Sequence, residues 1–275
     1  MKLSIVTPAF NAARWLPACV ASVRHACAGQ DYEHWIIDGG STDGTKDFLQ
    51  ANLDLRWVSE PDQGMYDALN KGVERAAGEV IGHLNADEQY NRSGFHSALE
   101  LISTRKEIDM VFGPTVMVDG DGNFLQLYKQ IVRPNFKDFI WSMPVQSCSV
   151  LYRRALWQRL GYDTRYRISA DHAWFYGQMR LGMKLAPVMD PFGIFTWHPA
   201  NLSNSGKIED ALPGINRHAF DVQLCKHIYR FRKLLAGGYR PAPIDYEIFQ
   251  NGELRKMHIT KPALKISVEK LRGQR

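Results

Sequence analysis

The chain has 275 residues, of which 45% are hydrophobic and 23% charged, a composition typical of a globular protein large enough to bury its own core. No stretch approaches the ~20 consecutive apolar residues of a membrane span, and the four cysteines lack the C-x-x-C spacing of a zinc or redox site. The formal net charge is +5, but residues 216–275 hold 13 Lys and Arg against 5 Asp and Glu, or +8, which leaves −3 for residues 1–215.

These features bound the location and the partners. Scattered cysteines favour free thiols in a reducing cytoplasm, and the short apolar run after Met1 and Lys2 is typical of a strand and not of a signal peptide. The basic C-terminal part indicates an anionic surface as partner. A membrane is favoured over nucleic acid, because the basic residues are not joined to a motif that reads bases.

Apolar runs and amphipathic segments alternate along the first third of the chain. We expect strands at 3–7, 35–37, 55–59 and 80–84, and helices at 15–26, 45–52 and 65–77. Alternation at this spacing predicts βαβ units and a mostly parallel sheet.

The next elements are shorter, and the chain ends in a basic segment. Further helices are expected at 93–105, 154–160 and 171–181, strands at 110–112, 149–152, 184–188 and 194–197, and a hairpin over 116–127. Residues 219–235 predict a basic amphipathic helix, and the order after Gly237-Gly238 is left unassigned. We therefore expect one domain over 1–215 and a basic, partly helical extension over 216–275.

Polar clusters follow the first four predicted strands directly, at 7–11, 38–45, 60–64 and 85–88. Parallel strands end at the same edge of a sheet, so the clusters predict one extended ligand site. The chain has no G-x-G-x-x-G after its first strand, no P-loop and no G-x-S-x-G, which argues against hydride transfer, NTP hydrolysis and serine hydrolase chemistry. Oxygen ligands at 85–88 suit a hard cation that holds a diphosphate, and the alternative is an exposed acidic turn.

Four successive segments carry a resemblance to a known family. T-P-A-F-N (7–11), I-D-G-G-S-T-D-G-T (37–45), S-E-P-D-Q-G-M-Y-D-A-L-N-K-G (59–72) and G-H-L-N-A-D-E (82–88) resemble the motifs of the family 2 glycosyltransferases, and the likeness covers roughly residues 2–205. It is greatest to bacterial enzymes that build surface and extracellular polysaccharides. The resemblance implies the GT-A fold, an α/β, Rossmann-like nucleotide-diphospho-sugar transferase architecture with a mixed, mainly parallel sheet, followed here by the basic helical C-terminal extension.

The resemblance also implies which residues contact a nucleotide-diphospho-sugar donor. Asp38 matches the acid that contacts the base, although it is also a natural turn former before Gly39. Lys71 is placed to offset diphosphate charge, with a solvated lysine as the alternative. The donor set as a whole is Thr7, Pro8, Phe10, Asn11, Asp38, Gly39, Asp67, Asn70, Lys71, Asn85 and Ala86.

A divalent metal, Mn²⁺ or Mg²⁺, is implied at the fourth motif. Asp87 matches the metal-binding aspartate, whereas Glu88 stands where the family has a second aspartate, so its role as a direct ligand is left open. His198, in T-W-H-P, lies where some GT-A enzymes place a late metal-binding histidine, and a structural histidine is the alternative.

The catalytic base is expected further along the chain. Asp171 in R-I-S-A-D-H matches the family aspartate that opens a helix and faces the acceptor, and a plain helix N-cap is the alternative. His172 is a competing base for which packing is favoured. Ser147-Cys148 departs from the His-Gln expected before the following strand.

The resemblance thus predicts an inverting glycosyltransferase of bacterial polysaccharide biosynthesis. It would move a sugar from a nucleotide-diphosphate donor, expected to be UDP-linked, to a hydroxyl of a glycan or lipid-linked glycan. The expected location is the cytoplasm. If the basic extension binds anionic lipid, the enzyme would act at the inner face of the cytoplasmic membrane. One alternative is a nucleotidyltransferase, which would need a Gly-rich basic loop that T-P-A-F-N-A-A-R lacks. The other is a module that binds nucleotide-sugar without transferring it, which Glu88 and Ser147-Cys148 favour.

Overall fold

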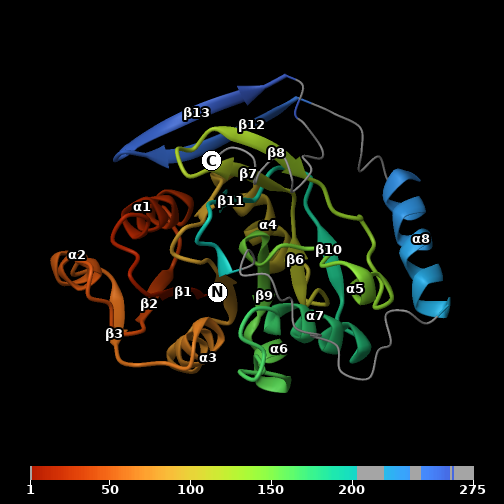
Figure 1. The fold of residues 1–275 in the computed structure, drawn as a ribbon, viewed down its shortest axis with the longest axis horizontal. Helices are drawn as coiled ribbons and strands as arrows, with labels where there is room; N and C mark the ends of the chain where they lie inside the picture. The colour runs from red at the N-terminus through yellow and green to blue at the C-terminus, as the bar shows by residue number, and fades with distance from the viewer. Residues whose placement is uncertain (1, 203–219, 236–242, 261, 263–275) are drawn as a thin grey trace.

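A computed structural model of the chain describes residues 2–202, 220–235, 243–260 and 262 (Figure 1). Its centre is a seven-stranded sheet in the order β10-β6-β9-β4-β1-β2-β3. Every neighbouring pair is parallel except those made by β9, which runs antiparallel to β4 and β6. The strands are β1 (Leu3–Ala9), β2 (Tyr32–Asp38), β3 (Arg56–Ser59), β4 (Val80–His83), β6 (Met110–Phe112), β9 (Val150–Arg153) and β10 (Leu185–Pro187).

A smaller four-stranded sheet lies beside the first, in the order β5-β11-β7-β8. A hairpin of β12 (Ile244–Gln250) and β13 (Glu253–Ile259) covers it, as the blue strands of Figure 1 show. Ile244, Tyr246 and Ile248 of the hairpin are buried in one cluster with apolar residues of the small sheet. The strands of that sheet are β5 (Gln89–Tyr90), β7 (Thr115–Asp119), β8 (Phe124–Tyr128) and β11 (Gly193–Trp197).

Helices cover both faces of the large sheet, because successive side chains of a strand point to opposite sides. Ile5 packs among residues of α1 (Leu16–Ala26) and α4 (Arg92–Thr104). Val6, one residue later, packs among residues of α3 (Met65–Arg75) and α7 (Ala170–Arg180). The remaining helices are α2 (Thr45–Ala51), α5 (Asp138–Trp141), the 3₁₀ turn η1 (Ser147–Ser149), α6 (Arg154–Arg159) and α8 (Phe220–Leu235).

Two local features set the position of the sheet edge that carries the polar clusters. The last residue pair between β1 and β4 is Val6 with His83, and Pro8 lies two residues beyond it. At Pro8, β1 is therefore paired with β2 only. The N–H that proline lacks is not needed on the unpaired side. Gly72 lets α3 lie close against β1, since a Cβ there would stand 2.3 Å from Cγ1 of Val6. The first turn of α3 is thereby held beside this edge.

The structure confirms the predicted α/β fold with its mainly parallel sheet and basic C-terminal helix. Every predicted helix and strand is present, and β2, which begins at Tyr32 instead of residue 35, shows the largest shift. β5, α5, η1 and the β12–β13 hairpin were not predicted. The domain boundary expected at residue 215 lies outside the described residues. Within the described ranges, no helix is long and apolar enough to cross a membrane.

Candidate active site

The loops after β1 and β2 are locked together by side-chain to backbone hydrogen bonds. Asn11 adopts a positive φ of 49°, its N–H donates to Oγ of Ser41 at 2.7 Å, and its Oδ1 accepts the N–H of Thr42 at 2.9 Å. Asp43 accepts the N–H of Ala13 at 2.9 Å. Phe10 projects from this paired loop with 67% of its surface exposed, so its ring is free to contact a ligand at the sheet edge.

Two of the predicted donor residues, Thr7 and Asp38, lie buried at the base of these loops. Thr7 is fully buried, and its hydroxyl lies 2.9 Å from Nε2 of His34, so its side chain points into the core. Asp38 is also fully buried. Its carboxylate accepts hydrogen bonds from the hydroxyls of Ser41 and Ser59 and from the N–H groups of Gly40 and Ser41, which fills the capacity of a carboxylate.

The third motif forms the first turns of α3 and is largely occupied by structural contacts. Asn70 donates to the carbonyl oxygen of Tyr162 at 2.8 Å and accepts from Trp157 Nε1 at 2.8 Å and from the N–H of Tyr162 at 3.0 Å. Its amide therefore fastens α3 to α6, and its expected contact with the donor stays a prediction. Lys71 lies 3.1 Å from Asp67 Oδ2 and 3.5 Å from Glu60, beside the 61–64 turn.

Gly39 keeps the space near this turn open, because a Cβ there would stand 2.7 Å from Oδ2 of Asp62 and 3.3 Å from the ring of Phe10. Pro8 and Ala86 are buried, so only their backbone can line a ligand site. The donor residues whose side chains are at least partly exposed at the sheet edge include Phe10, Asn11, Asp67, Lys71 and Asn85.

Asp87 and His198, distant in the sequence, meet after β4 and β11. Nε2 of His198 lies 2.9 Å from Oδ2 of Asp87, and both side chains are mostly buried, with 15% and 22% of their surface exposed. Asn201 donates to the same oxygen at 3.0 Å and accepts the N–H of His198 at 2.6 Å. The ring of Trp15 stacks on His198 with centroids 4.9 Å apart and planes 13° from parallel. The imidazole is therefore held from two sides against the carboxylate.

Glu88 lies beneath this pair and is 2% exposed. Its Oε2 accepts the N–H of Asn85 at 2.8 Å, and Asn85 Oδ1 lies 3.0 Å from Nε2 of the buried His83. Burial and then the charge of Asp87 raise the pKa of Glu88 to about 8. Glu88 therefore closes the turn after β4 through its hydrogen bond with Asn85, and its role as a direct metal ligand stays open.

Asp171 lies in the first turn of α7, half-buried, and is not the N-cap, which is Ser169. The Tyr66 hydroxyl lies 2.9 Å from its Oδ1, and the N–H of His172 donates to the same oxygen at 2.8 Å. Burial raises the pKa of Asp171, and these two hydrogen bonds oppose the shift. His172 is buried and its Nε2 contacts the carbonyl oxygen of Phe139, which agrees with a packing role and not with a second base.

Asp87, Glu88 and Asp171 belong to one electrostatic unit. The charges of both aspartates raise the pKa of Glu88. Among the described residues, no Lys or Arg forms an ion pair with any of the three. Asp87 and Asp171, neither of which pairs with a Lys or Arg in the described part of the chain, thus make a site that favours a cation.

The side chains near Asp87 indicate whether the expected Mn²⁺ or Mg²⁺ ion fits this site. No group of three or more His, Cys, Asp and Glu side chains in the described part of the chain is arranged to hold a metal ion. Asp87 and His198 are nevertheless adjacent, with an oxygen and an imidazole nitrogen that suit Mn²⁺. A metal in a nucleotide site takes only one or two protein ligands and completes its shell with phosphate oxygens and water, so the pair fits such an ion.

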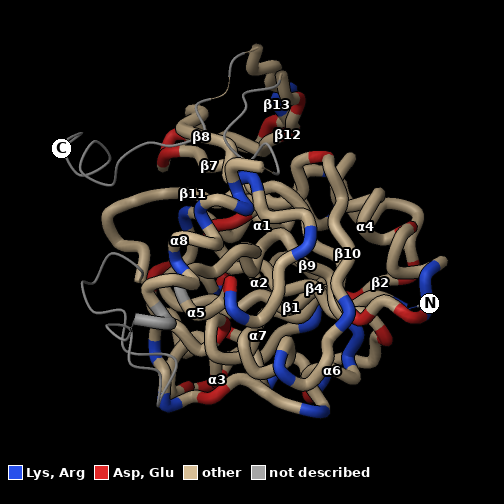
Figure 2. The backbone as a smooth tube through the Cα atoms, turned by 90° about the vertical axis from the view of Figure 1, so that its right-hand side faces the viewer, with Lys and Arg blue, Asp and Glu red and all other residues tan. Residues whose placement is uncertain are grey.

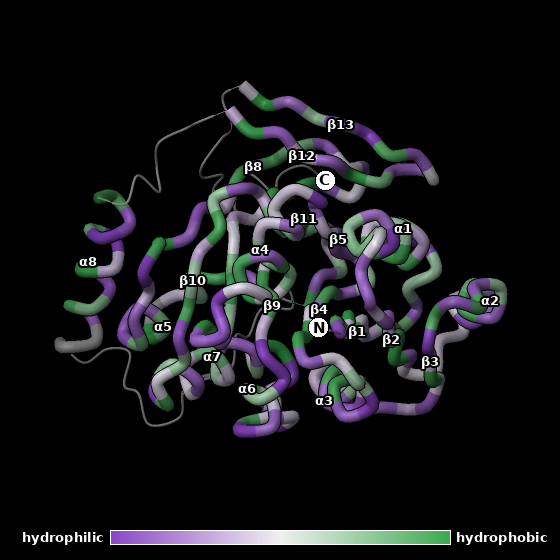
Figure 3. Tube along the Cα trace, turned by 180° about the vertical axis from the view of Figure 1, so that it is seen from behind, coloured by the Kyte–Doolittle hydropathy of each residue, from purple (hydrophilic) through white to green (hydrophobic). Residues whose placement is uncertain are grey.

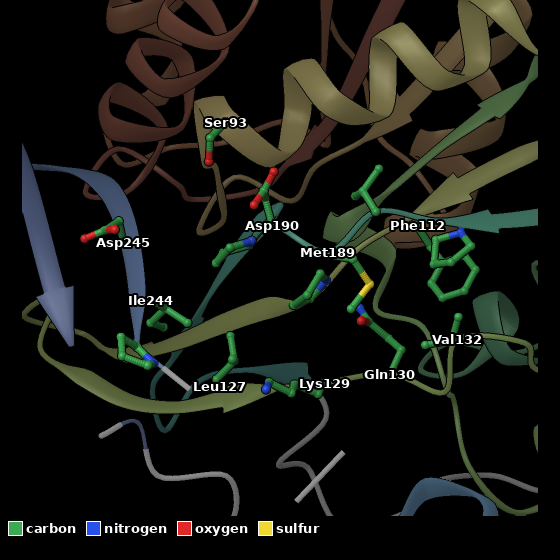
Figure 4. A pocket seen from close by; sticks show the side chains of 15 residues that line it. Ser93, Phe112, Leu127, Lys129, Gln130, Val132, Met189, Asp190, Ile244 and Asp245 are labelled. Carbon is green, nitrogen blue, oxygen red and sulfur yellow. The ribbon is translucent and has the colours of Figure 1, made fainter. Parts of the chain in front are cut away.

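A separate cavity of about 560 Å³ lies between β8, the loop before β11 and the start of β12, as Figure 4 shows. Met189, Asp190, Lys129 and Ile244 are among its lining residues. None of the predicted donor, metal or base residues lines it. The candidate site is therefore the open sheet edge and not this cavity.

Sequence reasoning missed three residues that complete the site. Tyr66 sits inside the third motif but contacts Asp171, which lies more than a hundred residues away in the chain. Trp15 and Asn201 position His198 and Asp87. Tyr66 and Trp15 are brought to the site only by the tertiary structure. The segment H-P-A-N (198–201) is typical of a turn, which would place Asn201 near His198.

Comparisons with known proteins identify the family of the chain. The sequence profile of the family described as "Glycosyl transferase family 2" matches residues 4–161. A "PGL/p-HBAD biosynthesis glycosyltransferase" of Mycobacterium bovis is 33% identical over 178 residues, which are 61% of this chain and 66% of that protein. An uncharacterized glycosyltransferase of Nostoc is 26% identical over 218 residues, 73% of this chain and 66% of the relative. The matches span about two thirds of the length of these relatives.

Solved structures share the fold at low sequence identity. Residues 1–349 of S. aureus TarS in complex with UDP superpose with a TM-score of 0.58 and 17% identity, covering 72% of this chain and 61% of that one. The Pyrobaculum calidifontis mannosyltransferase PcManGT, in complex with GDP-Man and Mn²⁺, gives a TM-score of 0.51 and 19% identity, covering 71% and 56%. The profile match extends over more than half of the sequence, and the chain belongs to the family 2 glycosyltransferases.

Proposed function

We propose that this chain transfers a sugar from a nucleotide-diphosphate donor to a hydroxyl group of an acceptor, in one displacement with inversion. The observation that supports the proposal is that the Asp87–His198 pair and the Asp171–Tyr66 pair both lie close enough to Glu88 for their aspartates to act on it. Glu88 responds electrostatically to both aspartates, which supports a single site.

In this mechanism Asp171 is the general base. Its carboxylate takes the proton of the acceptor hydroxyl while that oxygen attacks the anomeric carbon and the bond to the diphosphate breaks. Tyr66 and the N–H of His172 fix the orientation of the carboxylate. Its raised pKa makes Asp171 a stronger base than an exposed aspartate.

Asp87 and His198 would hold the divalent ion, Mn²⁺ or Mg²⁺, and a bound ion supplies charge neutralisation to the leaving diphosphate. Asn201 and Trp15 orient these two side chains. Glu88 supports the turn that carries Asp87. The GT-A neighbour described with Mn²⁺ supports the choice of metal.

For the donor we propose a UDP-sugar held by the edge that carries Phe10, Asn11, Lys71 and Asn85. TarS structures described with UDP and with UDP-GlcNAc support this choice. The acceptor is a glycan or a lipid-linked glycan of bacterial polysaccharide or glycolipid biosynthesis, which the name of the mycobacterial relative supports. The site of action is the cytoplasm, at the inner face of the membrane, where anionic lipid would be the partner of the basic C-terminal part.

A screen of UDP- and GDP-sugars for slow nucleotide release tests the proposal. We expect release of UDP from one donor, dependent on Mn²⁺ or Mg²⁺ and lost in Asp87→Ala. Binding of a nucleotide-sugar without release under any condition would favour the non-transferring module, and formation of a nucleotide-sugar from NTP would favour the nucleotidyltransferase.

A further inference from the structure

Helix α8 presents its apolar face away from the protein. Leu224, Ile228, Phe231 and Leu235 follow four- and three-residue spacing and so share one face. All four are exposed, at 48%, 47%, 60% and 71%, and Leu234 beside them is 58% exposed. Figure 1 shows α8 at the outer edge of the molecule.

The opposite face of α8 is attached to the domain through polar and aromatic contacts. Tyr229 is buried, and Arg232 contacts the carboxylate of Asp138 and the carbonyl oxygen of Arg133. The ammonium of Lys233 lies 4.5 Å from the centroid of the Tyr128 ring. These contacts fix the rotation of the helix about its axis and thereby the outward direction of the apolar face.

This orientation is the reverse of that expected for a helix on a globular domain, where the apolar face packs on the core. Hydrophobic and hydrophilic residues are both visible along α8 in Figure 3. A contiguous exposed apolar patch of this kind marks a surface that contacts another body.

Charge decides between the possible occupants. α8 contains Lys226, Arg230, Arg232 and Lys233 against one acidic residue, and Figure 2 marks these basic residues in blue. Arg230 and His227 are exposed beside the apolar face. A second copy would bring two basic helices together with mutual repulsion. An anionic lipid surface would instead be attracted by the same charges.

We infer that α8 is an interfacial helix whose outward face (Leu224, Ile228, Phe231, Leu234 and Leu235) inserts into the headgroup region of an anionic lipid bilayer, with Arg230 contacting lipid phosphates. A helix of this length with an apolar face and basic flanks lies in the plane of the interface. The inference rests on the proposed function in one respect, because it assumes a lipid-linked acceptor. It adds which surface of the protein faces the membrane that holds this acceptor.

Co-sedimentation with vesicles tests the inference on the full chain. Vesicles of phosphatidylcholine alone and of phosphatidylcholine mixed with phosphatidylglycerol are compared at low and high salt. We expect the protein to sediment with the anionic vesicles at low salt. The variant Phe231→Gln/Leu235→Gln, which keeps good helix formers on α8, should partition at least about tenfold less.

A matched control replaces two exposed leucines elsewhere. Leu53 and Leu181 are 93% and 55% exposed, and Leu53→Gln/Leu181→Gln should bind vesicles as the unaltered chain does. Asp171→Asn should also bind normally. UDP release from donor in solution is measured on every variant, so a failure of lipid binding is distinguished from a failure of the proposed enzyme activity.

Four results would overturn the inference. The full chain could remain in solution with strongly anionic vesicles, or Phe231→Gln/Leu235→Gln could bind as well as the unaltered chain. The double variant could instead abolish a dimer seen by sedimentation equilibrium or lower the unfolding temperature without lipid. A lost dimer would assign the face to a second copy, and a lower unfolding temperature would assign it to another segment of this chain.

Discussion

Asp171 and Tyr66 show how a single hydrogen bond can tune the base. Burial raises the pKa of Asp171, and the Tyr66 hydroxyl is the first of the groups that lower it. Tyr66→Phe should therefore raise the pKa of Asp171 further, since the carboxylate loses a donor. The acidic limb of the kcat/KM profile should move to higher pH by about one pH unit, the equivalent of one lost charge-assisted hydrogen bond.

Tyr176→Phe, on the same helix as Asp171, is the matched control and should leave the pH profile unchanged.

Asp171→Asn should retain donor binding while transfer falls by about a hundredfold or more, the usual contribution of a general base. Turnover that persists in Asp171→Asn would move the role of base to another residue.

Asp87 is the residue on which the metal proposal depends. Removal of its carboxylate leaves His198 and Asn201 without their shared acceptor and leaves a bound diphosphate without a metal ligand. In Asp87→Ala, the gain in UDP affinity that Mn²⁺ provides should disappear in calorimetric titration. Asp121→Ala, whose side chain is 82% exposed, should behave as the unaltered chain. A Mn²⁺-dependent gain that survives in Asp87→Ala would place the ion elsewhere.

Among the elements, the β12–β13 hairpin shows where sequence reasoning stopped short. The alternation of Ile244, Tyr246 and Ile248 and the turn residues Asn251-Gly252, with φ of 52° and 83°, are typical of a hairpin. The elements from β1 to β4 follow one another in βαβ order, so periodicity and turn residues were enough to predict them. Nothing in the sequence indicates that this hairpin docks on β7, β8 and β11, because that contact depends on tertiary packing.

The side chain of Gln89 fixes the position of the hairpin on the domain through two hydrogen bonds to the backbone of Phe249. Its side chain accepts the N–H of Phe249 at 2.8 Å and donates to the carbonyl oxygen of the same residue at 3.0 Å. Gln89→Ala should lower the free energy of unfolding by about 1–3 kcal/mol, because both backbone groups lose their partner. Urea unfolding measures the loss, and Gln50→Ala on the exposed side of α2 is the control. An unchanged urea midpoint would show that these two hydrogen bonds add no stability.

Site residues could be predicted where their type and sequence position identify them. Residues that reach the site only through contacts between distant parts of the chain were missed. Asp87, His198 and Asp171 were predicted because their types and positions match family motifs. For Asp38 and Asn70 the residue types suggest ligand binding, but their partners Ser59 and Trp157 come from other parts of the chain and could not be predicted. Motif matching identifies the residue and leaves open which atoms it faces.

In the whole molecule, the C-terminal part divides into pieces with different roles. A truncation after Gly238 would remove Ile244, Tyr246 and Ile248 from a shared core. Each such side chain contributes about 1.5–3 kcal/mol when fully buried, and a domain has only about 5–15 kcal/mol in all. We expect this truncation to lower the unfolding temperature sharply and to bind a hydrophobic dye. A truncated chain that melts like the full chain would show that the hairpin adds no stability.

A truncation after Pro262 isolates the electrostatic contribution to lipid binding. It keeps α8 and the hairpin and removes residues 263–275, which contain Lys265, Lys270, Arg272 and Arg275 against Glu269, a net charge of +3. Each basic residue near an anionic surface contributes on the order of 1 kcal/mol. The shortened chain should therefore bind phosphatidylglycerol-containing vesicles at least about tenfold more weakly at low salt, with a smaller salt dependence. Equal binding of the two chains would show that α8 alone makes the contact, and a difference that persists on neutral vesicles would contradict an electrostatic origin.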